Sequence, residues 1–346
     1  MTHEVSIPCT LISEIREIMN TARHNVARQV NHDQLLAYWN IGRLIVAYEQ
    51  GNNLRADYGK ETIKQLSVTL SREFGKGFSR SNLQNMRSFY VYYPKCQTLS
   101  GKLTWSHYCE LLVISDPERR SFYEKECERS GWSIRELKRQ ISTSLFERLL
   151  LSEGKANKEK VLELATKGQE ILSPEDIVKE PYVFEFLGIP EGKPVLESDL
   201  EKALVRQIEN FLLELGRGFM FVGTQQRVTL NNTHYFVDMV FYNKELHAYV
   251  LIELKTVKLM PEAVGQLNMY LNYYAAEVNE PGDNPPIGII LCTDKDNVSA
   301  EYALGGLSNK IFASTYTYVI PNKEKLIAQV KEVLEHFKDA PLKAQS

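Results

Sequence analysis

The sequence predicts an α+β chain of two domains: an all-α domain, then an α/β domain with elements in the order helix, three strands, helix, strand (αβββαβ). The chain has 346 residues, enough for two domains of about 150 residues each. In the first half, apolar residues recur at three-to-four spacing, which is typical of helices, whereas the second half has short apolar runs between turn residues, which are typical of strands. We therefore expect a helical domain over residues 1–151, a linker over 152–180 and the α/β domain over 181–340, with an exposed helix as the alternative to linker for residues 152–168.

The helical domain is predicted element by element from this spacing. Helices are expected over residues 10–50 and 61–74, from Ser79 to before Pro94, within 100–115, and over 117–130 and 133–151. Ser79 is the expected N-cap of its helix, and Pro94 stops that helix. Ser133 is a second expected cap, with Glu136 at the capping-box position.

The helix over 61–74, the glycine-bearing turn at residues 75–78 and the helix from Ser79 have the outline of a helix-turn-helix, and the candidate contacts lie in the segment 76–90. The segment contains no acidic residue, and its basic and amide side chains suit contacts with phosphates and base edges. The candidates for nucleic-acid binding are Lys76, Arg80, Asn82 and Arg87. The alternative is an ordinary polar helix face within an all-helical domain.

The α/β domain is predicted from turn residues and apolar runs. An amphipathic helix over 200–215 ends at Gly216. Strands are expected over 219–230, around Asp238, up to Lys255, and over 287–292 and 311–320, with helices from Pro261 to about 278 and over 323–337. Asn231-Asn232 is expected to form the first turn between strands.

Charged side chains on two neighbouring strands form the candidate site. Asp238 stands within an apolar run, and Glu253 and Lys255 end the next strand. Because strand side chains alternate between faces, Glu253 and Lys255 share a face, and a hairpin near Asn243-Lys244 brings Asp238 alongside.

Two carboxylates and one ammonium in this arrangement suit metal-assisted phosphodiester hydrolysis. An unpaired buried carboxylate is costly, and Mg²⁺ is held by one or two carboxylates with water and substrate phosphate. A neighbouring lysine can orient a water molecule or stabilise charge developing on a phosphate. The alternative for so short a motif is an exposed salt bridge between Glu253 and Lys255 at a strand end.

Composition excludes several classes of protein. No apolar run approaches the ~20 residues of a membrane span, and the N-terminus lacks a signal-peptide pattern, so we expect a cytoplasmic protein. The five cysteines are scattered, without a C-x-x-C pair, which argues against a disulfide framework and a zinc site. No small organic cofactor is expected. With a net charge of −3, nucleic-acid binding needs a local basic surface.

Several long motifs carry a resemblance to a known family. The order of elements and the acid pair with lysine resemble the PD-(D/E)XK nuclease superfamily, which has a restriction-endonuclease-like fold. Nearly the whole chain is similar to the bacterial YhcG family. The motifs that carry this resemblance are YWNIGRLIV (38–46), YGKETIKQLSVTLSREFGKGFSRSNLQNMRSFYVYYP (58–94), TWSHYCELL (104–112), LEKAL (200–204), FLLELGRGFMFVGTQ (211–225), YFVDMVFYN (235–243), VLIELK (250–255), GQLNMYLNYY (265–274) and NPPIGIILCTDKD (284–296).

The resemblance implies roles for the site residues. Asp238 and Glu253 would hold Mg²⁺ or Mn²⁺, and the Leu254 carbonyl would add a ligand. Lys255 would orient the attacking water, and Gln266 would position Lys255 or the scissile phosphate.

The resemblance also implies a metal-binding acid on the helix before the first strand. Glu201 and Glu209 are both available, and we prefer Glu201 because it lies in LEKAL. Gln225 is expected to face either the site or DNA. The chain departs from the superfamily name at Val237, where that name implies proline, so the position of Asp238 depends on strand register alone.

The sequence therefore predicts a metal-dependent nuclease, with DNA as its expected substrate and a homodimer as its expected assembly. The alternative is a non-catalytic nucleic-acid-binding or scaffold protein that retains a nuclease fold. A metal-dependent cleavage assay with a Lys255→Ala variant separates the two.

Overall fold

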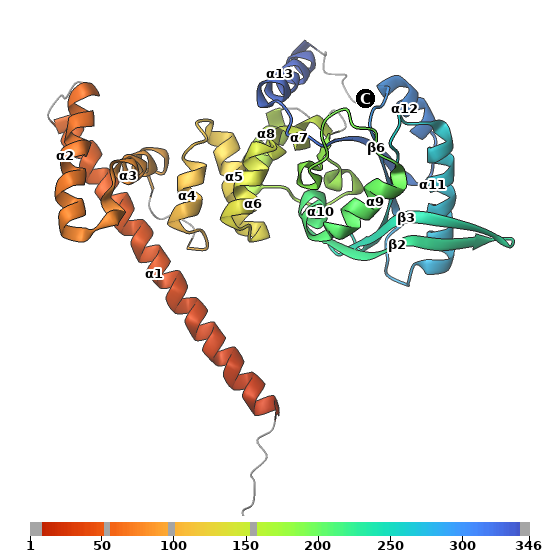
Figure 1. Ribbon diagram of the computed structural model, residues 1–346, viewed down its shortest axis with the longest axis horizontal. Coiled ribbons are helices and arrows are strands. Elements are labelled where there is room, and N and C mark those ends of the chain that lie inside the picture. The colour runs from red at the N-terminus through yellow and green to blue at the C-terminus, as the bar shows by residue number, and fades with distance from the viewer. Residues whose placement is uncertain (1–8, 52–55, 96–100, 153–157, 340–346) are drawn as a thin grey trace, which may run out of the picture. The chain divides into compact units, whose positions relative to one another are not determined.

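The computed structural model describes residues 9–51, 56–95, 101–152 and 158–339 (Figure 1). The chain divides into two compact units, residues 1–138 and 139–346. The first unit is helical, and the second combines a mixed sheet with helices, as the sequence predicts. The predicted domain boundaries at 151 and 180 stay predictions. In the described residues, no helix is long and apolar enough to cross a membrane.

The first unit is built on one long helix. Its elements are α1 (Cys9–Gly51), α2 (Ala56–Phe74), η1 (Lys76–Phe78), α3 (Arg80–Tyr92), α4 (Trp105–Leu111) and α5 (Pro117–Ser130). Leu83, Met86 and Phe89 of α3 are fully buried. A Cβ atom on Gly42 of α1 would lie 2.0 Å from the Met86 carbonyl oxygen, so the close approach of α1 and α3 requires glycine at this position.

The helix ends in this unit follow the capping residues. Ser79 caps α3, because its side chain accepts a hydrogen bond from the Asn82 N–H. Ser133 Oγ accepts from the Glu136 N–H at 3.2 Å. Both predicted caps are confirmed.

The strands of the second unit form one mixed sheet in the order β1-β6-β5-β4-β3-β2. The strands β2 (Phe219–Leu230), β3 (Thr233–Asn243) and β4 (Ala248–Leu254) are antiparallel, whereas β4, β5 (Ile287–Cys292), β6 (Lys310–Thr317) and β1 (Tyr182–Val183) are parallel. Asn231 and Asn232, with φ of 46° and 62°, form the tight turn between β2 and β3.

Helices cover both faces of this sheet. One apolar cluster joins α9 (Glu197–Arg206) and α10 (Ile208–Leu215) to the sheet, and a second joins α11 (Pro261–Tyr273) and α12 (Asn297–Leu304) to it. Within β3 the clusters alternate, since Met239 and Phe241 belong to the first and Val240 to the second. The remaining elements are α6 (Ile134–Ser142), α7 (Leu145–Leu151), α8 (Lys158–Lys167), η4 (Pro174–Ile177), η5 (Glu185–Leu187), η6 (Tyr274–Val278) and α13 (Lys323–Asp339).

Two helices predicted as continuous are each broken in two. The predicted helix over 133–151 is interrupted at Ser144, whose φ of 56° is left-handed. The break leaves the Thr143 carbonyl free to accept a hydrogen bond from Arg148 Nε at 2.9 Å. The predicted helix over 200–215 is interrupted at Gln207, where φ is −112° and ψ is 32°. The short strand β1 and the helix α12 were not predicted from the sequence pattern.

A buried cluster of charged side chains connects α6, α7, β1 and α10. Glu214 of α10 is fully buried, and its carboxylate lies 2.5 Å from Arg148 Nη1 and 2.9 Å from Arg139 Nη2. The Val183 N–H also donates to it, and Lys179 donates to the Glu214 carbonyl. Every formal charge in this cluster therefore has a partner, as burial requires.

Candidate active site

The register between β3 and β4 places the predicted acids side by side. Met239 is opposite Ile252, so Asp238 and Glu253 are neighbours across the ladder. The Asp238 N–H donates to Glu253 Oε1 at 3.4 Å, and Asp238 Oδ2 accepts from the Leu254 N–H at 2.9 Å. The structure therefore brings together the two carboxylates that the sequence singled out.

The ammonium of Lys255 lies between two carboxylates. Its Nζ is 3.5 Å from Glu253 Oε2 and 3.4 Å from Glu197 Oε2. The other Glu197 oxygen accepts from the Thr256 N–H at 3.4 Å. Glu197 was not among the predicted site residues, although it lies one helical turn before Glu201 on α9, a spacing that places both on one helix face.

Gln225 links the helix acid to the strand acid. Its Nε2 donates to Glu201 Oε2 at 2.8 Å and to Asp238 Oδ1 at 3.3 Å. Its φ of 47° is left-handed, and the β2–β3 register shifts close by, between Phe221 and Gly223. Such irregularities turn a strand side chain in a new direction and are frequent beside functional sites. Of the two helix acids considered, Glu201 lies at this site, whereas Glu209 is exposed on α10.

Electrostatics at the site favour a bound cation. Burial, followed by the charge of Asp238, raises the pKa of Glu253 to about 8. Burial also raises the pKa of Asp238 and of Glu201. For Lys255, burial alone would lower the pKa of the ammonium, but the surrounding carboxylates, Glu253 first, raise it. Lys255 is therefore a fixed positive charge rather than a proton acceptor.

The residues present fit a divalent metal ion. Glu253 is 1% exposed, so its ionised form needs a positive partner, and Lys255 supplies only one charge for two strand acids. Among the described residues, no group of three or more His, Cys, Asp or Glu side chains is arranged around a metal position. Mg²⁺ needs no such group, since it is usually bound by one or two carboxylates and several waters.

Two other predicted site residues lie on the elements expected. Leu254 is the last residue of β4, and its N–H is the group that binds Asp238. Gln266 lies on α11, where its Nε2 donates to the Tyr270 hydroxyl at 2.6 Å. Burial raises the pKa of Tyr270, and the charges of Glu253 and Asp238 raise it further. Gln266 and Tyr270 therefore lie within electrostatic range of the two acids. A contact between Gln266 and Lys255 stays a prediction.

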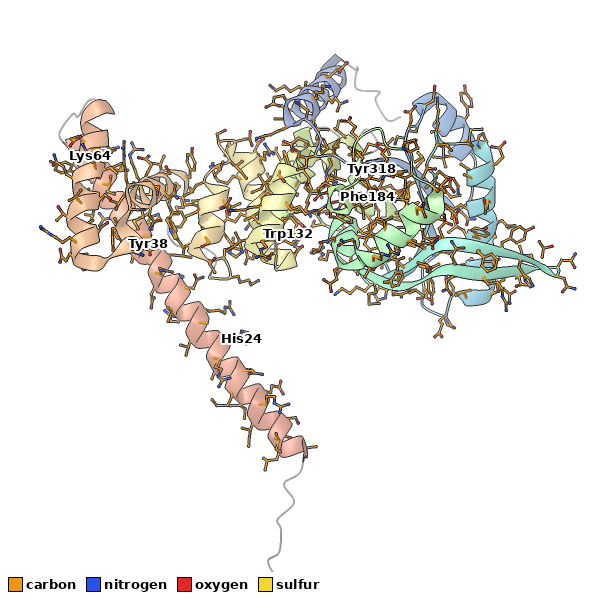
Figure 2. All side chains as sticks on the ribbon, viewed as in Figure 1. His24, Tyr38, Lys64, Trp132, Phe184 and Tyr318 are labelled. Atoms are coloured by element: carbon orange, nitrogen blue, oxygen red, sulfur yellow. The ribbon has the colours of Figure 1, made fainter. Side chains whose placement is uncertain are left out.

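The residues predicted to bind nucleic acid in the first unit differ in availability. Lys76 and Arg80 are exposed. Arg87 pairs with Glu49 at 2.8 Å, and Asn82 accepts from Trp105 Nε1 at 2.7 Å while donating to the Gly77 carbonyl. Side chains of the N-terminal half of α1, around His24 in Figure 2, extend into solvent.

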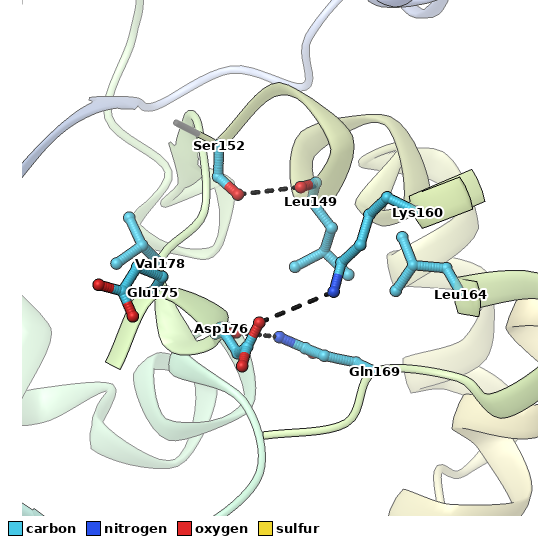
Figure 3. A pocket seen from close by; sticks show the side chains of 8 residues that line it. All are labelled: Leu149, Ser152, Lys160, Leu164, Gln169, Glu175, Asp176 and Val178. Atoms are coloured by element: carbon cyan, nitrogen blue, oxygen red, sulfur yellow. Dashed lines mark hydrogen bonds and ion pairs between the residues drawn. The ribbon is translucent and has the colours of Figure 1, made fainter. Parts of the chain in front are cut away.

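A small pocket elsewhere in the second unit is lined by none of the candidate site residues. It lies between Leu149, Lys160 and Val178 and encloses about 10 Å³ (Figure 3). Lys160 Nζ lies 3.7 Å from Asp176 Oδ1, and the Gln169 amide donates to the Asp176 carbonyl at 2.5 Å. Its polar groups are thus paired with one another, and it contains none of the predicted site residues.

Comparison with known proteins identifies both halves of the chain. The family model "DUF1016 N-terminal domain" matches residues 14–148, and "YhcG PDDEXK nuclease domain" matches residues 175–332. The Escherichia coli (strain K12) protein named "Putative nuclease YhcG" is 36% identical over 356 residues, covering 93% of this chain and 94% of that protein.

Two solved structures are similar over a smaller part. A repair endonuclease from Pyrococcus abyssi is 15% identical, with a TM-score of 0.24, and covers 36% of this chain. The apo form of EndoMS is 18% identical, with a TM-score of 0.25, and covers 38%. Each match spans 49% of the other chain, about half its length. By its sequence match along almost all of both chains and by the two family models, the chain belongs to the YhcG family and carries a PDDEXK nuclease domain.

Proposed function

We propose that this protein is a metal-dependent nuclease that hydrolyses phosphodiester bonds of DNA with Mg²⁺ or Mn²⁺. The observation that carries the proposal is the pairing of Asp238 and Glu253 on adjacent strands, with the Lys255 ammonium 3.5 Å from Glu253. Nucleases with a PDDEXK domain generally use divalent metal ions, and the buried Glu253 needs more positive charge than Lys255 alone provides.

Each site residue has a distinct proposed role in hydrolysis. Asp238 and Glu253 hold the metal, which supplies Lewis-acid activation of water and phosphate when bound. Lys255 orients the attacking water and stabilises charge on the phosphate oxygens. Gln225 fixes the rotamer of Asp238, and Glu201 supports Gln225. A P–O bond forms to the water oxygen as the P–O bond to the sugar oxygen breaks; the water gives up a proton to solvent, and the leaving sugar oxygen takes one from solvent.

A cleavage assay tests this function. Supercoiled, linear, single-stranded and branched DNA are incubated with Mg²⁺, Mn²⁺ or EDTA, using wild type, Asp238→Ala and Lys255→Ala. The matched control is Lys258→Ala, which removes an exposed lysine close to the site. We expect metal-dependent products from wild type and the control only. Equal cleavage by all variants would contradict the assignment, and DNA binding without any cleavage would favour the non-catalytic scaffold.

DNA contact by the first unit is part of the proposal. Lys76 and Arg80 are exposed near the N-terminus of α3, where a helix attracts phosphate. We expect double replacement by alanine to weaken DNA binding and reduce its salt dependence. Arg87, paired with Glu49, has a smaller expected effect.

A homodimer is also proposed, with α1 as its interface. Ile12, Ile15, Met19, Ala22 and Val26 follow the alternating three-and-four spacing of a coiled-coil seam, and all are exposed. A second copy would cover this stripe. Light scattering should give a dimer mass for wild type and a monomer mass for Ile15→Glu, and a monomeric wild type would exclude the assembly.

A further inference from the structure

The strands β2 and β3 continue beyond β4 as a two-stranded extension. The pairing of β3 with β4 runs from Met239 to Asn243, whereas its pairing with β2 continues to Leu230 opposite Thr233. Figure 1 shows this extension projecting from the sheet. We call residues 226–237 the hairpin arm. It begins directly beside Gln225 and Asp238, so it adjoins the candidate active site.

One face of the hairpin arm is held by α11. Val228 and Val237 are fully buried in the same cluster as Tyr270. The Tyr235 ring packs near the Tyr270 ring, with centroids 6.4 Å apart. Because this face is packed, the arm has a fixed position and offers only its other face to a ligand.

The other face of the hairpin arm exposes polar, basic and aromatic side chains and no acidic one. Arg227 is opposite Phe236, and Thr229 is opposite His234, with 3.0 Å between Thr229 Oγ1 and His234 Nδ1. All four side chains are exposed, Phe236 by 47%. We call these four residues the outer face. Because strand side chains alternate, Phe236 and His234 lie on the side of the arm opposite Val237 and Tyr235, which pack towards α11.

The charge and shape of the outer face suit nucleic acid. Residues 226–237 contain no aspartate or glutamate, although the chain as a whole carries a net charge of −3. A single exposed phenylalanine is ordinary on a protein surface. Here its cross-strand neighbour is Arg227, and Phe236 and Arg227 lie two positions along their strands from Asp238 and Gln225, respectively. Aromatic rings that stack on bases beside cations that contact phosphates are characteristic of single-strand binding.

We propose that the outer face of the hairpin arm binds unpaired nucleotides next to the scissile phosphate, with Phe236 stacking on a base and Arg227 contacting a phosphate. This inference rests on the proposed nuclease function and specifies its substrate. In a duplex the base faces are covered by stacking, so Phe236 has no base to contact. A two-stranded ribbon can also enter a major groove with one face, but Phe236 would then meet base edges rather than a base face on which to stack.

Binding measurements on the full chain test the inference. Wild type, Phe236→Ala, Phe236→Trp and Arg227→Ala are titrated in EDTA with a fluorescent single strand and with the matching duplex. Tyr302→Ala is the control, because Tyr302 is an aromatic of the same unit that is 84% exposed. We expect Phe236→Ala to weaken single-strand binding about tenfold, with little change for duplex. Phe236→Trp should restore the affinity. Arg227→Ala should lower the slope of log affinity against log salt by about 0.7.

Three results would overturn the inference. The first is a single-strand affinity of Phe236→Ala equal to that of Tyr302→Ala. The second is an equal loss of affinity for duplex. The third is a change in molecular mass of Phe236→Ala by light scattering, which would assign the outer face to an interface between copies.

Failure of the inference and failure of the proposed function are distinguishable. If wild type cleaves no DNA with either metal but Phe236→Ala loses single-strand binding, the hairpin arm is a binding site and the nuclease proposal is wrong. If wild type cleaves and Phe236→Ala binds normally, the nuclease proposal stands and the arm has no part in substrate binding.

Discussion

Replacing Glu214 by glutamine should destabilise the second unit by about 3 kcal/mol at pH 7. Burial alone would raise the pKa of Glu214, but the charges of Arg148, Lys179 and Arg139 lower it from 4.5 to about 2. A tenfold difference in proton affinity corresponds to about 1.4 kcal/mol, so the ionised carboxylate contributes about 3 kcal/mol. An independent estimate agrees, because removing one partner of a buried ion pair costs about 3–5 kcal/mol.

The sign of the pH dependence follows from the direction of the shift. The folded state binds the Glu214 proton more weakly than the unfolded state does, so the contribution is complete above about pH 5 and is lost as pH falls towards 2. Urea denaturation of wild type and Glu214→Gln at several pH values measures it. The difference between the two proteins should shrink on acidification.

A second carboxylate of the same cluster provides the control. Glu185 lies 2.6 Å from Arg139, but its side chain is 20% exposed, so Glu185→Gln should have a clearly smaller effect at pH 7. A loss below about 1 kcal/mol for Glu214→Gln, or a loss that does not change with pH, would refute the assignment of this cluster as a main source of stability.

Three further predictions concern strain and packing. Gln225→Gly should raise the free energy of unfolding by up to about 1 kcal/mol, since it relieves a left-handed backbone, yet lower cleavage; unchanged cleavage would contradict its role. In EDTA at pH 7, Glu253→Gln should stabilise the protein by about 3 kcal/mol, because the folded state must protonate a buried carboxyl whose pKa is raised from 4.5 to about 8. A lower thermal midpoint would argue against this. Gly42→Ala should lower the free energy of unfolding by about 1–3 kcal/mol, because its Cβ would meet the Met86 carbonyl. Gly265→Ala is the control, since the space around Gly265 is open, and it should stabilise α11 by about 0.5–1 kcal/mol. Equal effects of the two substitutions in thermal unfolding would contradict the packing of α1 on α3.

Local patterns in the sequence predicted most of the fold. The bounds of β2 agree with the expected strand over 219–230, and the caps at Ser79 and Ser133 are where side-chain chemistry places them. The breaks at Ser144 and Gln207 could not be predicted in this way. Ser144 is left-handed next to a carbonyl that binds the buried Arg148, and Arg148 in turn requires Glu214, 66 residues away.

The site shows the same division between local and long-range information. Strand alternation and one hairpin were enough to place Asp238, Glu253 and Lys255 together. The contacts of Glu197 with Lys255, and of Gln225 with Glu201, depend on how α9 lies against the sheet and on a local distortion of β2. Neither has a signature in the sequence, because a surface glutamate and a strand glutamine occur in many settings.

The packing of the sheet between two apolar clusters bears on which parts of the nuclease domain can open. Every residue of β5 is buried, as are six of the seven residues of β4. Amide hydrogens of these strands can exchange with solvent only if both clusters separate, which amounts to unfolding of the domain. Glu253 is attached to this slowly exchanging region. The turn at Asn231 and Asn232 is exposed and packs on neither cluster, so its amides should exchange quickly. Glu253 therefore lies on the most deeply packed strands of the domain, and we expect local opening to be confined to the tip of the hairpin.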